Sequence, residues 1–270
     1  MTIIEAIIVG IVQGLTEFLP VSSSGHLVIV PEFMNTEPPG LAFDVLLHLA
    51  TALAVVGYFA AEIYKIVLAF LAPGRLTPED AKAFRRLGLW LGLGTIPAGF
   101  AGVLLEDFFA SLFDSTLAVG VFLLVTTALL VAADRMALHR GSGPSLDRLG
   151  PSNSLIIGLF QAMAIAPGIS RSGATIAAGI FLGLDREAAA RFSFLLSIPV
   201  ILGAGILSLG DLRTGFGGQT GVYIAGAVAA LLSGLFAVHF MLRFLREHRL
   251  RPFAVYTFVL GIVVILLSLA

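Results

Sequence analysis

The chain has 270 residues, of which 58% are hydrophobic and 12% charged, and its mean hydropathy is +1.01. Because about a quarter of the residues of soluble proteins are charged, this composition excludes an ordinary soluble domain and predicts an all-α polytopic membrane protein. The apolar runs are continuous and about twenty residues long, which suits helices rather than the shorter alternating strands of outer-membrane barrels. A net charge of −1 gives no basis for a nucleic-acid partner, and a chain without cysteine has no disulfide, thiolate metal site or thiol nucleophile.

Two short apolar arms, residues 3–19 and 27–33, flank a polar tip that follows Pro20. Neither arm is long enough to cross the hydrocarbon, so the pattern predicts a re-entrant helical hairpin, followed by an acidic loop around Glu37. Irregular backbone at membrane depth persists only inside protein or along a wet cavity, where a reaction centre would lie. The N-terminus lacks the features of a signal peptide, and we expect residues from Met1 onward to belong to the mature fold.

Six further segments are apolar enough to cross the membrane. A charged segment (62–86) and a short acidic connection (106–114) separate the first three of them, and a polar linker at about 134–153 divides the chain. A second broken element at 154–184 is interrupted between Ala166 and Gly173. The expected transmembrane helices lie at about 41–61, 87–105, 114–133, 188–208, 221–241 and 252–269.

The two halves of the chain repeat each other. The segment beginning at Gly10 and ending at Gln13 matches Gly158 to Gln161 at an offset of 148, and the Ser-x-Ser-Gly at 22–25 matches that at 170–173. A Phe-x-x-Leu-Leu pattern at 43–47 recurs at 192–196. We therefore expect one integral membrane domain over 1–270, built from repeat one (about 1–133), the linker and repeat two (about 154–270).

Lysine and arginine predict the orientation, because cytoplasmic loops collect them. The connections at 31–40 and 106–114 carry neither residue, so the first hairpin should enter from outside, the second from inside, and both termini should lie outside. This is an inverted-topology repeat, whose site is expected where the two hairpins meet near mid-membrane. The basic residues of the expected inner segments are Lys65, Arg75, Lys82, Arg85, Arg86, Arg135, Arg140, Arg148, Arg243, Arg246, Arg249 and Arg251.

Arg171 is the decisive residue of the second tip. A guanidinium inside a membrane needs an anion, and its fork suits phosphate or carboxylate. Backbone and hydroxyl donors surround it, and the helix that resumes there directs its N-terminus at the tip. The structural alternative is that Arg171 simply pairs with Glu17. The residues expected around a bound phosphate at this tip are Gly168, Ser170, Ser172, Gly173 and Thr175.

The first tip holds a carboxylate, three hydroxyls and an imidazole within ten positions. Ser22, Ser23 and Ser24 are candidate nucleophiles, His26 a candidate base, and Glu17 either orients His26 or binds a metal. Ser23 is preferred because it lies three residues before His26, although His26 could itself attack. The alternative is that this stretch is only a polar loop after a short buried helix. The second copy of the pattern disfavours this alternative. These are the groups needed for nucleophilic transfer followed by hydrolysis.

A metal would have few ligands here. Gln13 lies four residues before Glu17, so the two side chains share one helix face. One carboxylate and one amide could hold Mg²⁺ or Ca²⁺ only with help from substrate phosphate oxygens. His48 lies within an expected span and is interpreted as a helix-packing residue rather than a ligand.

The motifs QGLTEFLPVSSSGH and PGISRSGAT, over the full length of the chain, resemble the undecaprenyl-diphosphate phosphatase family, also called the bacitracin resistance protein family. The resemblance implies removal of the terminal phosphate of a C55 polyprenyl diphosphate at the outer face of the plasma membrane, which recycles the lipid carrier of cell-wall polymers. Bacitracin competes for that substrate. By position, the resemblance places Glu17, Ser23, His26 and Arg171 in the catalytic set, with Ser22, Ser24 and the donors of the second tip around the phosphate.

The resemblance also implies a divalent ion, Mg²⁺ or Ca²⁺, although many members have glutamate where this chain has Gln13. Acid-phosphatase-like lipid phosphatases need a histidine where this chain has Ala177, so that class is excluded. A polyprenyl-phosphate flippase is the competing class, because inverted repeats are a transporter architecture. The expected partners are the lipid substrate and membrane lipids. The preferred prenyl length and the oligomeric state stay open, a homodimer being one alternative.

Overall fold

The computed structural model describes residues 1–34, 40–140, 146, 149–208 and 219–269, without the side chains of 31–33 and 139–140. The acidic loop around Glu37 and most of the linker after residue 140 lie outside the described residues. Those described form α-helices and the short 3-10 helix η1 (Pro73–Arg75), with no strand among them. The helices are α1 (Ile3–Phe18), α2 (Ser23–Phe33), α3 (Leu41–Tyr58), α4 (Ala60–Leu71), α5 (Pro78–Leu104), α6 (Glu106–Phe113), α7 (Thr116–Arg140), α8 (Pro151–Met163), α9 (Arg171–Phe181), α10 (Arg186–Leu207), α12 (Thr220–Glu247) and α13 (Arg251–Ser268).

Six of these helices are long and apolar enough to span a membrane, which confirms the all-helical, multi-pass prediction. Large apolar side chains cover their outward faces; Leu104 and Leu207, for example, are each 73% exposed. Such a surface suits lipid, which supplies the apolar contacts that water cannot. The six spanning helices are α3, α5, α7, α10, α12 and α13.

Most of the charged segment 62–86 is helical, where the sequence predicted a connection. Helix α4 folds back on α5, and the guanidinium of Arg85 donates to the Ala69 carbonyl from Nε at 3.2 Å and from Nη2 at 2.9 Å. Helix α5 begins at Pro78 rather than near 87, because Thr77 caps it by accepting from the Asp80 N–H. The acidic connection at 106–114 likewise contains the short helix α6. In both places charge patterning did not indicate where the helix begins or ends.

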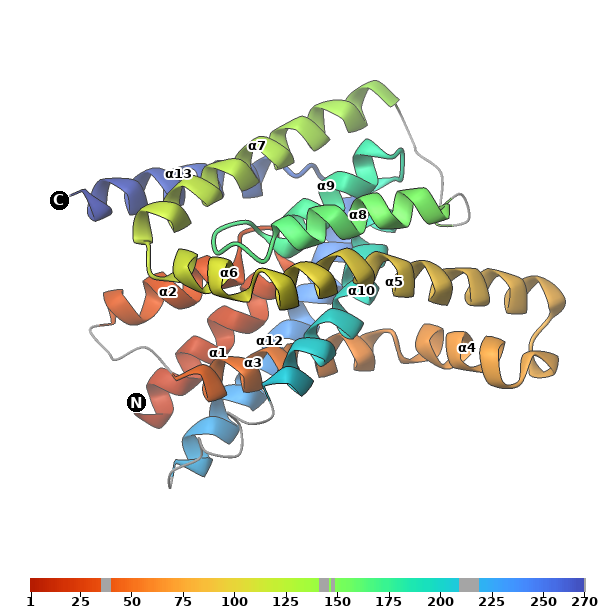
Figure 1. Ribbon diagram of the computed structural model, residues 1–270, viewed down its shortest axis with the longest axis horizontal. Helices are drawn as coiled ribbons and strands as arrows, with labels where there is room; N and C mark the ends of the chain where they lie inside the picture. The colour runs from red at the N-terminus through yellow and green to blue at the C-terminus, as the bar shows by residue number, and fades with distance from the viewer. Residues whose placement is uncertain (35–39, 141–145, 147–148, 209–218, 270) are drawn as a thin grey trace.

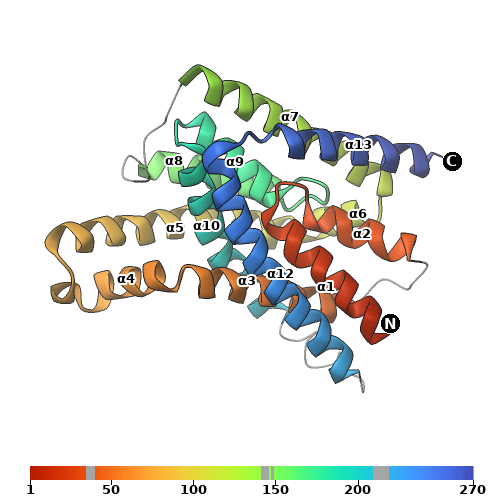
Figure 2. The ribbon, with the colours of Figure 1, turned by 180° about the vertical axis from the view of Figure 1, so that it is seen from behind.

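Two pairs of short helices, α1–α2 and α8–α9, lie among the six long ones. Figure 1 shows that α1–α2 enters from the end that carries both termini, whereas α8–α9 enters from the opposite end, and their turns approach each other in the middle. Helix α1 lies along α12, as Figure 2 also shows, and α8 lies along α5. Helices α7 and α13 form a further long pair. The two turns therefore meet inside a shell of long helices.

Glycines allow the short helices to approach the long ones closely. A Cβ placed on Gly10 would collide with the backbone carbonyl of Gly226 on α12, and one on Gly158 would collide with that of Gly94 on α5. Helices in membranes associate by this kind of close packing, because lipid removes the hydrophobic advantage of burying large side chains. The packing fixes α1 and α8, and with them the two turns.

Candidate active site

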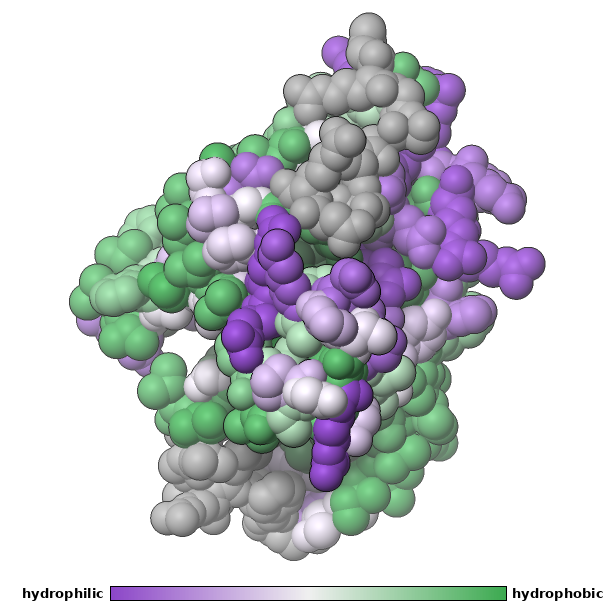
Figure 3. Space-filling view, turned by 90° about the vertical axis from the view of Figure 1, so that its right-hand side faces the viewer, coloured by the Kyte–Doolittle hydropathy of each residue, from purple (hydrophilic) through white to green (hydrophobic). Residues whose placement is uncertain are grey.

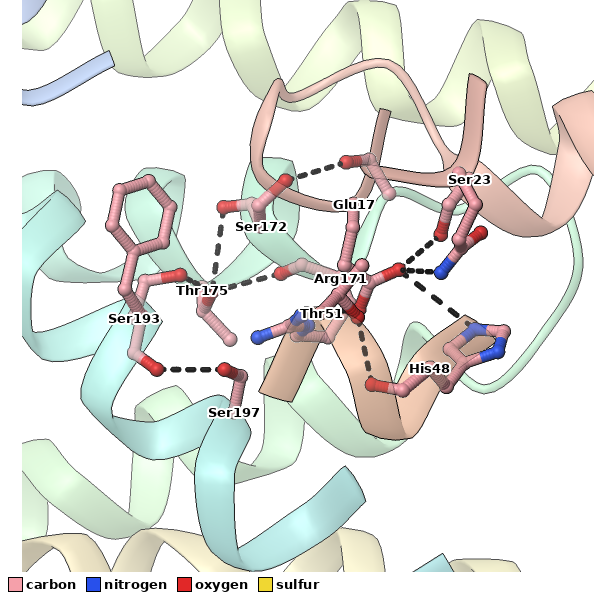
Figure 4. A network of polar contacts seen from close by, with 12 residues as sticks. Glu17, Ser23, His48, Thr51, Arg171, Ser172, Thr175, Ser193 and Ser197 are labelled. Carbon is pink, nitrogen blue, oxygen red and sulfur yellow. Dashed lines mark hydrogen bonds and ion pairs between the residues drawn. The ribbon is translucent and has the colours of Figure 1, made fainter. Parts of the chain in front are cut away.

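The carboxylate of Glu17, near the end of α1, is the centre of the buried polar cluster in Figure 4. Its Oε1 accepts from Nη2 of Arg171 at 2.5 Å, across 154 residues of sequence. Its Oε2 accepts from the Ser23 hydroxyl at 2.6 Å and from Nε2 of Gln13 at 3.0 Å. Because Glu17 is 6% exposed, these donors replace water around the buried charge. One carboxylate thus joins the candidate nucleophile to the candidate phosphate-binding cation.

The first turn reverses the chain between Phe18 and Ser23. Pro20 cannot continue helix α1, and Ser22 adopts a left-handed backbone with φ of 70°. The Ser22 hydroxyl accepts from the Gly25 N–H at 3.3 Å, as an N-cap does. This reversal brings Ser23 back to Glu17, six residues earlier.

The second turn, between α8 and α9, is anchored to α7. The Thr126 hydroxyl donates to the Gly168 carbonyl and accepts from the Ser170 N–H, both at 2.9 Å. Gly168 has φ of 97°, and a Cβ there would collide with the Val119 carbonyl, so this position requires glycine. Ser170 caps α9 by accepting from the Gly173 N–H at 3.0 Å. Arg171 is therefore the first residue of a well-anchored helix.

The Ser172 hydroxyl joins the second turn to the first by donating to the Leu19 carbonyl at 3.0 Å. The Thr175 hydroxyl donates to the Arg171 carbonyl within α9 at 2.8 Å and contacts Ser193 of α10 at 2.6 Å. Nη1 of Arg171 is buried and has no hydrogen-bond partner among the described residues. This donor is suited to an anion that enters beside Glu17.

The structure brings together Gln13, Glu17, Ser23 and Arg171 of the predicted set. The predicted phosphate-binding residues lie on the two turns, where their hydroxyls and amides mainly hold the turns in shape. Among the described residues, no hydrogen bond joins His26 to Ser23. Its Nδ1 lies 2.7 Å from the Ser22 carbonyl and its Nε2 2.7 Å from the hydroxyl of Tyr256 on α13.

His48 is a site residue that the sequence interpretation missed. Its Nε2 lies 3.8 Å from Oε2 of Glu17, while its Nδ1 lies 2.8 Å from the Asp44 carbonyl. One signal could have identified it, since an ionisable residue inside a predicted span is a functional candidate by default. Asp44, one turn earlier, carries the same signal, and its Oδ1 is buried without a partner in the described part of the chain.

A metal would find few ligands at this centre. The described residues contain no group of three or more His, Cys, Asp or Glu that could hold one. However, Oε1 of Gln13 is buried and lacks a partner among the described residues, and it lies on the side chain that contacts Glu17. Amide and carboxylate oxygens are ligands that Mg²⁺ and Ca²⁺ prefer. The pair fits such an ion only as part of a shell completed by other oxygens.

Fold and site together define a multi-pass membrane protein with a buried centre in which a carboxylate accepts hydrogen bonds from a hydroxyl and a guanidinium. Residues 6–263 match the family described as bacitracin resistance protein BacA, and the chain belongs to this family.

Relatives named undecaprenyl-diphosphatase match this chain along its length. The protein of Methanobrevibacter smithii is 44% identical, covering 100% of this chain and 99% of its own. That of Syntrophotalea carbinolica is 43% identical over 97% of both chains, and that of Methanosphaera stadtmanae 40% over 99% of both.

Proposed function

We propose that this protein is a membrane phosphatase that hydrolyses undecaprenyl diphosphate to the monophosphate and inorganic phosphate. Full-length relatives at about 40% identity carry that activity in their names, and the family is one of bacitracin resistance. The reaction returns the lipid carrier to cell-wall synthesis, and it lowers the amount of diphosphate that bacitracin can bind. The flippase alternative is not favoured by these matches. The observation that carries the proposal is the placement of Ser23 and Arg171 on the two oxygens of Glu17.

Ser23 is the proposed nucleophile. Its hydroxyl already donates to Glu17, so the carboxylate can take the proton as Oγ attacks the terminal phosphorus. The bond from phosphorus to the bridging oxygen breaks, and the lipid monophosphate leaves with those electrons and takes the proton from Glu17. Water then attacks the phosphoserine and gives a proton to the regenerated Glu17 carboxylate. The bond from phosphorus to Oγ breaks, inorganic phosphate leaves, and Glu17 returns the proton to Ser23. The hydroxyl contact supports Glu17 as the acceptor of this proton, in place of His26, the base expected from sequence.

Arg171 is proposed to bind the terminal phosphate. Its Nη2 holds Glu17 and its buried Nη1 is available for a phosphate oxygen, so one guanidinium can align nucleophile, base and substrate. The start of α9 adds backbone N–H groups and the positive end of the helix dipole. Both stabilise charge that develops on the phosphoryl oxygens during transfer.

Gln13 and Glu17 are the residues that would hold Mg²⁺ or Ca²⁺, with the diphosphate supplying further oxygens. Such an ion would neutralise charge on the phosphates. The proton transfers described above do not involve it.

The chain is further proposed to be one integral domain of two inverted repeats, with α1–α2 and α8–α9 as re-entrant hairpins. None of the four short helices is among the six candidate spans. The longest of them, α1, has 16 residues and measures about 24 Å, less than the hydrocarbon thickness. The matching residues Gly10 and Gly158 make equivalent close contacts, each with a long helix of the other half. These features support duplication with opposite entry of the hairpins.

Both termini and the opening of the site are proposed to face outward. The termini lie at one end of the molecule, and the basic α4–α5 connection lies at the other. Figure 3 shows the latter end, where hydrophilic residues gather between hydrophobic flanks. The positive-inside rule assigns this end to the cytoplasm.

The decisive test is hydrolysis by purified protein in detergent supplied with undecaprenyl diphosphate. We expect release of one inorganic phosphate per lipid, with lipid monophosphate as the other product. A protein that binds the lipid, moves it across proteoliposomes and releases no phosphate would overturn the proposal in favour of transport.

Cysteine labelling tests the orientation. The chain has no cysteine, and both Gly40 and Gly74 are exposed with open space at the Cβ position. In intact cells an impermeant thiol reagent should label Gly40→Cys and should label Gly74→Cys only after lysis. The reverse pattern would show that the assigned orientation is wrong.

A further inference from the structure

Ser22 is the only residue other than glycine with a positive φ among those that the structure describes. L-amino acids rarely adopt this conformation, and it persists only where surrounding contacts impose it. Ser23, the proposed nucleophile, directly follows Ser22, so relaxation of the Ser22 backbone to negative φ would move Ser23. The contacts that hold Ser22 therefore matter for the position of Ser23.

Two groups of His26 form hydrogen bonds with the Ser22 carbonyl oxygen. The backbone N–H of His26 donates to this oxygen at 3.3 Å, and Nδ1 of its ring lies 2.7 Å away. Because a carbonyl oxygen can only accept, Nδ1 carries the proton. In the neutral ring Nε2 is then an acceptor, and the Tyr256 hydroxyl, 2.7 Å away, donates to it.

Tyr256 reaches this position from α13, 230 residues along the chain from His26. The residue is 46% exposed on an apolar helix surface, yet its ring stacks on the imidazole with centroids 5.7 Å apart and planes at 5°. A hydroxyl on an apolar surface is costly without a partner, which favours the bond to His26. Tyr256 thus fixes the orientation of the imidazole, in the tautomer that the Ser22 carbonyl requires.

We propose that Tyr256 is a positioning residue: its hydroxyl fixes His26, His26 holds the left-handed Ser22 carbonyl, and the held turn directs Ser23 at Glu17. In this arrangement His26 works through Nδ1 as a clamp and its Nε2 takes no proton from Ser23. The inference rests on the proposed function, since the position of Ser23 matters only if Ser23 attacks.

The first test is Tyr256→Phe, which removes the hydroxyl and keeps the stacked ring. We expect kcat to fall roughly threefold to tenfold while KM changes less than about twofold, since one hydrogen bond is lost and the phosphate contacts stay. Single-turnover formation of phosphoserine should slow by the same factor. Tyr64→Phe, at an exposed position of α4, is the matched control and should leave both unchanged.

The second test separates a clamp from a base. The amide nitrogen of Asn can replace Nδ1, and that of Gln replaces Nε2, so His26→Asn should retain clearly more activity than His26→Gln or His26→Ala. Adding Tyr256→Phe to His26→Asn should cost nothing further, because the acceptor of the tyrosine is already gone.

Several outcomes would overturn the inference. They are a normal kcat in folded Tyr256→Phe, equal inactivity of all three His26 variants, or full additivity of the double variant. Wild-type protein is assayed in parallel. Absence of phosphate release from the wild type would contradict the proposed function itself, whereas a normal wild type with an unaffected Tyr256→Phe would contradict only the positioning role.

Discussion

The two turns at the centre of the molecule share one scaffold and differ in the chemistry that it carries. In each, the two serine hydroxyls of Ser-x-Ser-Gly lie 3.2 Å apart, and the glycine N–H donates to the first of them, at 3.3 Å in one turn and 3.0 Å in the other. The intervening residue is Ser23 in the first turn and Arg171 in the second, at an offset of 148. These two equivalent positions each provide a hydrogen-bond donor to a different oxygen of the Glu17 carboxylate.

The difference shows how two turns of the same geometry can form an asymmetric site. Glu17 corresponds to Ile165 and His26 to Ala174, so only the first turn has the proposed base and the proposed imidazole clamp. The second turn places its left-handed residue at a glycine, Gly168, and needs no such clamp. A symmetric site would place two hydroxyls or two cations together, whereas this one pairs the proposed nucleophile, Ser23, with the cation Arg171.

Glu17→Gln should break the pairing most severely. It keeps the shape of the side chain but removes the proton acceptor of Ser23 and the counter-charge of Arg171, so kcat should fall on the order of ten-thousandfold in a phosphate-release assay. Glu62→Gln is the control, since Glu62 also forms an ion pair with an arginine, Arg191, away from the turns. Retention of even a tenth of the wild-type rate by folded Glu17→Gln would exclude Glu17 as the base.

Ser23→Ala should reduce kcat roughly a thousandfold, less than the loss of Glu17, because Glu17 could still direct water at the phosphorus. Wild-type protein quenched in acid with terminally labelled substrate should carry an acid-stable phosphoserine, which the variant lacks. Ser111→Ala on α6 should keep the label. An acid-labile phosphoenzyme would instead indicate attack by His26.

Arg171→Lys tests the second turn. A lysine keeps the charge but cannot reach Glu17 and a phosphate oxygen together, so kcat/KM should fall about a hundredfold. Arg191→Lys makes the same change at the ion pair with Glu62 and should have little effect on hydrolysis. Comparable losses in both variants would indicate a general need for arginine in the fold rather than a phosphate contact.

Much of this arrangement could be predicted from the sequence. Length and hydropathy predicted the six spans, and the alternative of an Arg171–Glu17 pair is confirmed as a contact in the structure. The helices α4 and α6 were missed because their charged residues resemble those of connections.

The contacts of His26 could not be predicted from local spacing. Ser23 and His26 are three residues apart at the start of α2, but the imidazole is drawn to the Ser22 carbonyl and to Tyr256. Helical spacing says which side chains share a face. It does not say which acceptor a ring nitrogen selects or which distant helix supplies its second partner.

The smallest expected effect comes from the glutamines of the repeat, Gln13 and Gln161. Both are buried, at 0% and 1% exposure, and both have an Oε1 without a partner among the described residues. Their amide nitrogens differ: that of Gln13 donates to Glu17 at 3.0 Å, whereas that of Gln161 reaches the Gly94 carbonyl at 3.5 Å. Only Gln13 should therefore affect the reaction.

Gln13→Ala should lower kcat/KM about tenfold, the cost of one hydrogen bond to a charged group, and should raise the Mg²⁺ or Ca²⁺ concentration needed for half-maximal activity. Gln13→Glu should lower that concentration, because a second carboxylate strengthens a hard-cation site. Gln161→Ala removes the same atoms from the other repeat, where Ile165 replaces the carboxylate, and should leave both quantities near wild type. Equal losses in the two alanine variants would mean that the glutamines act through helix packing. The same dependence on metal concentration in Gln13→Ala and Gln13→Glu would show that Gln13 is not a metal ligand. The tenfold effect of Gln13→Ala would then be explained by the lost hydrogen bond to Glu17 alone.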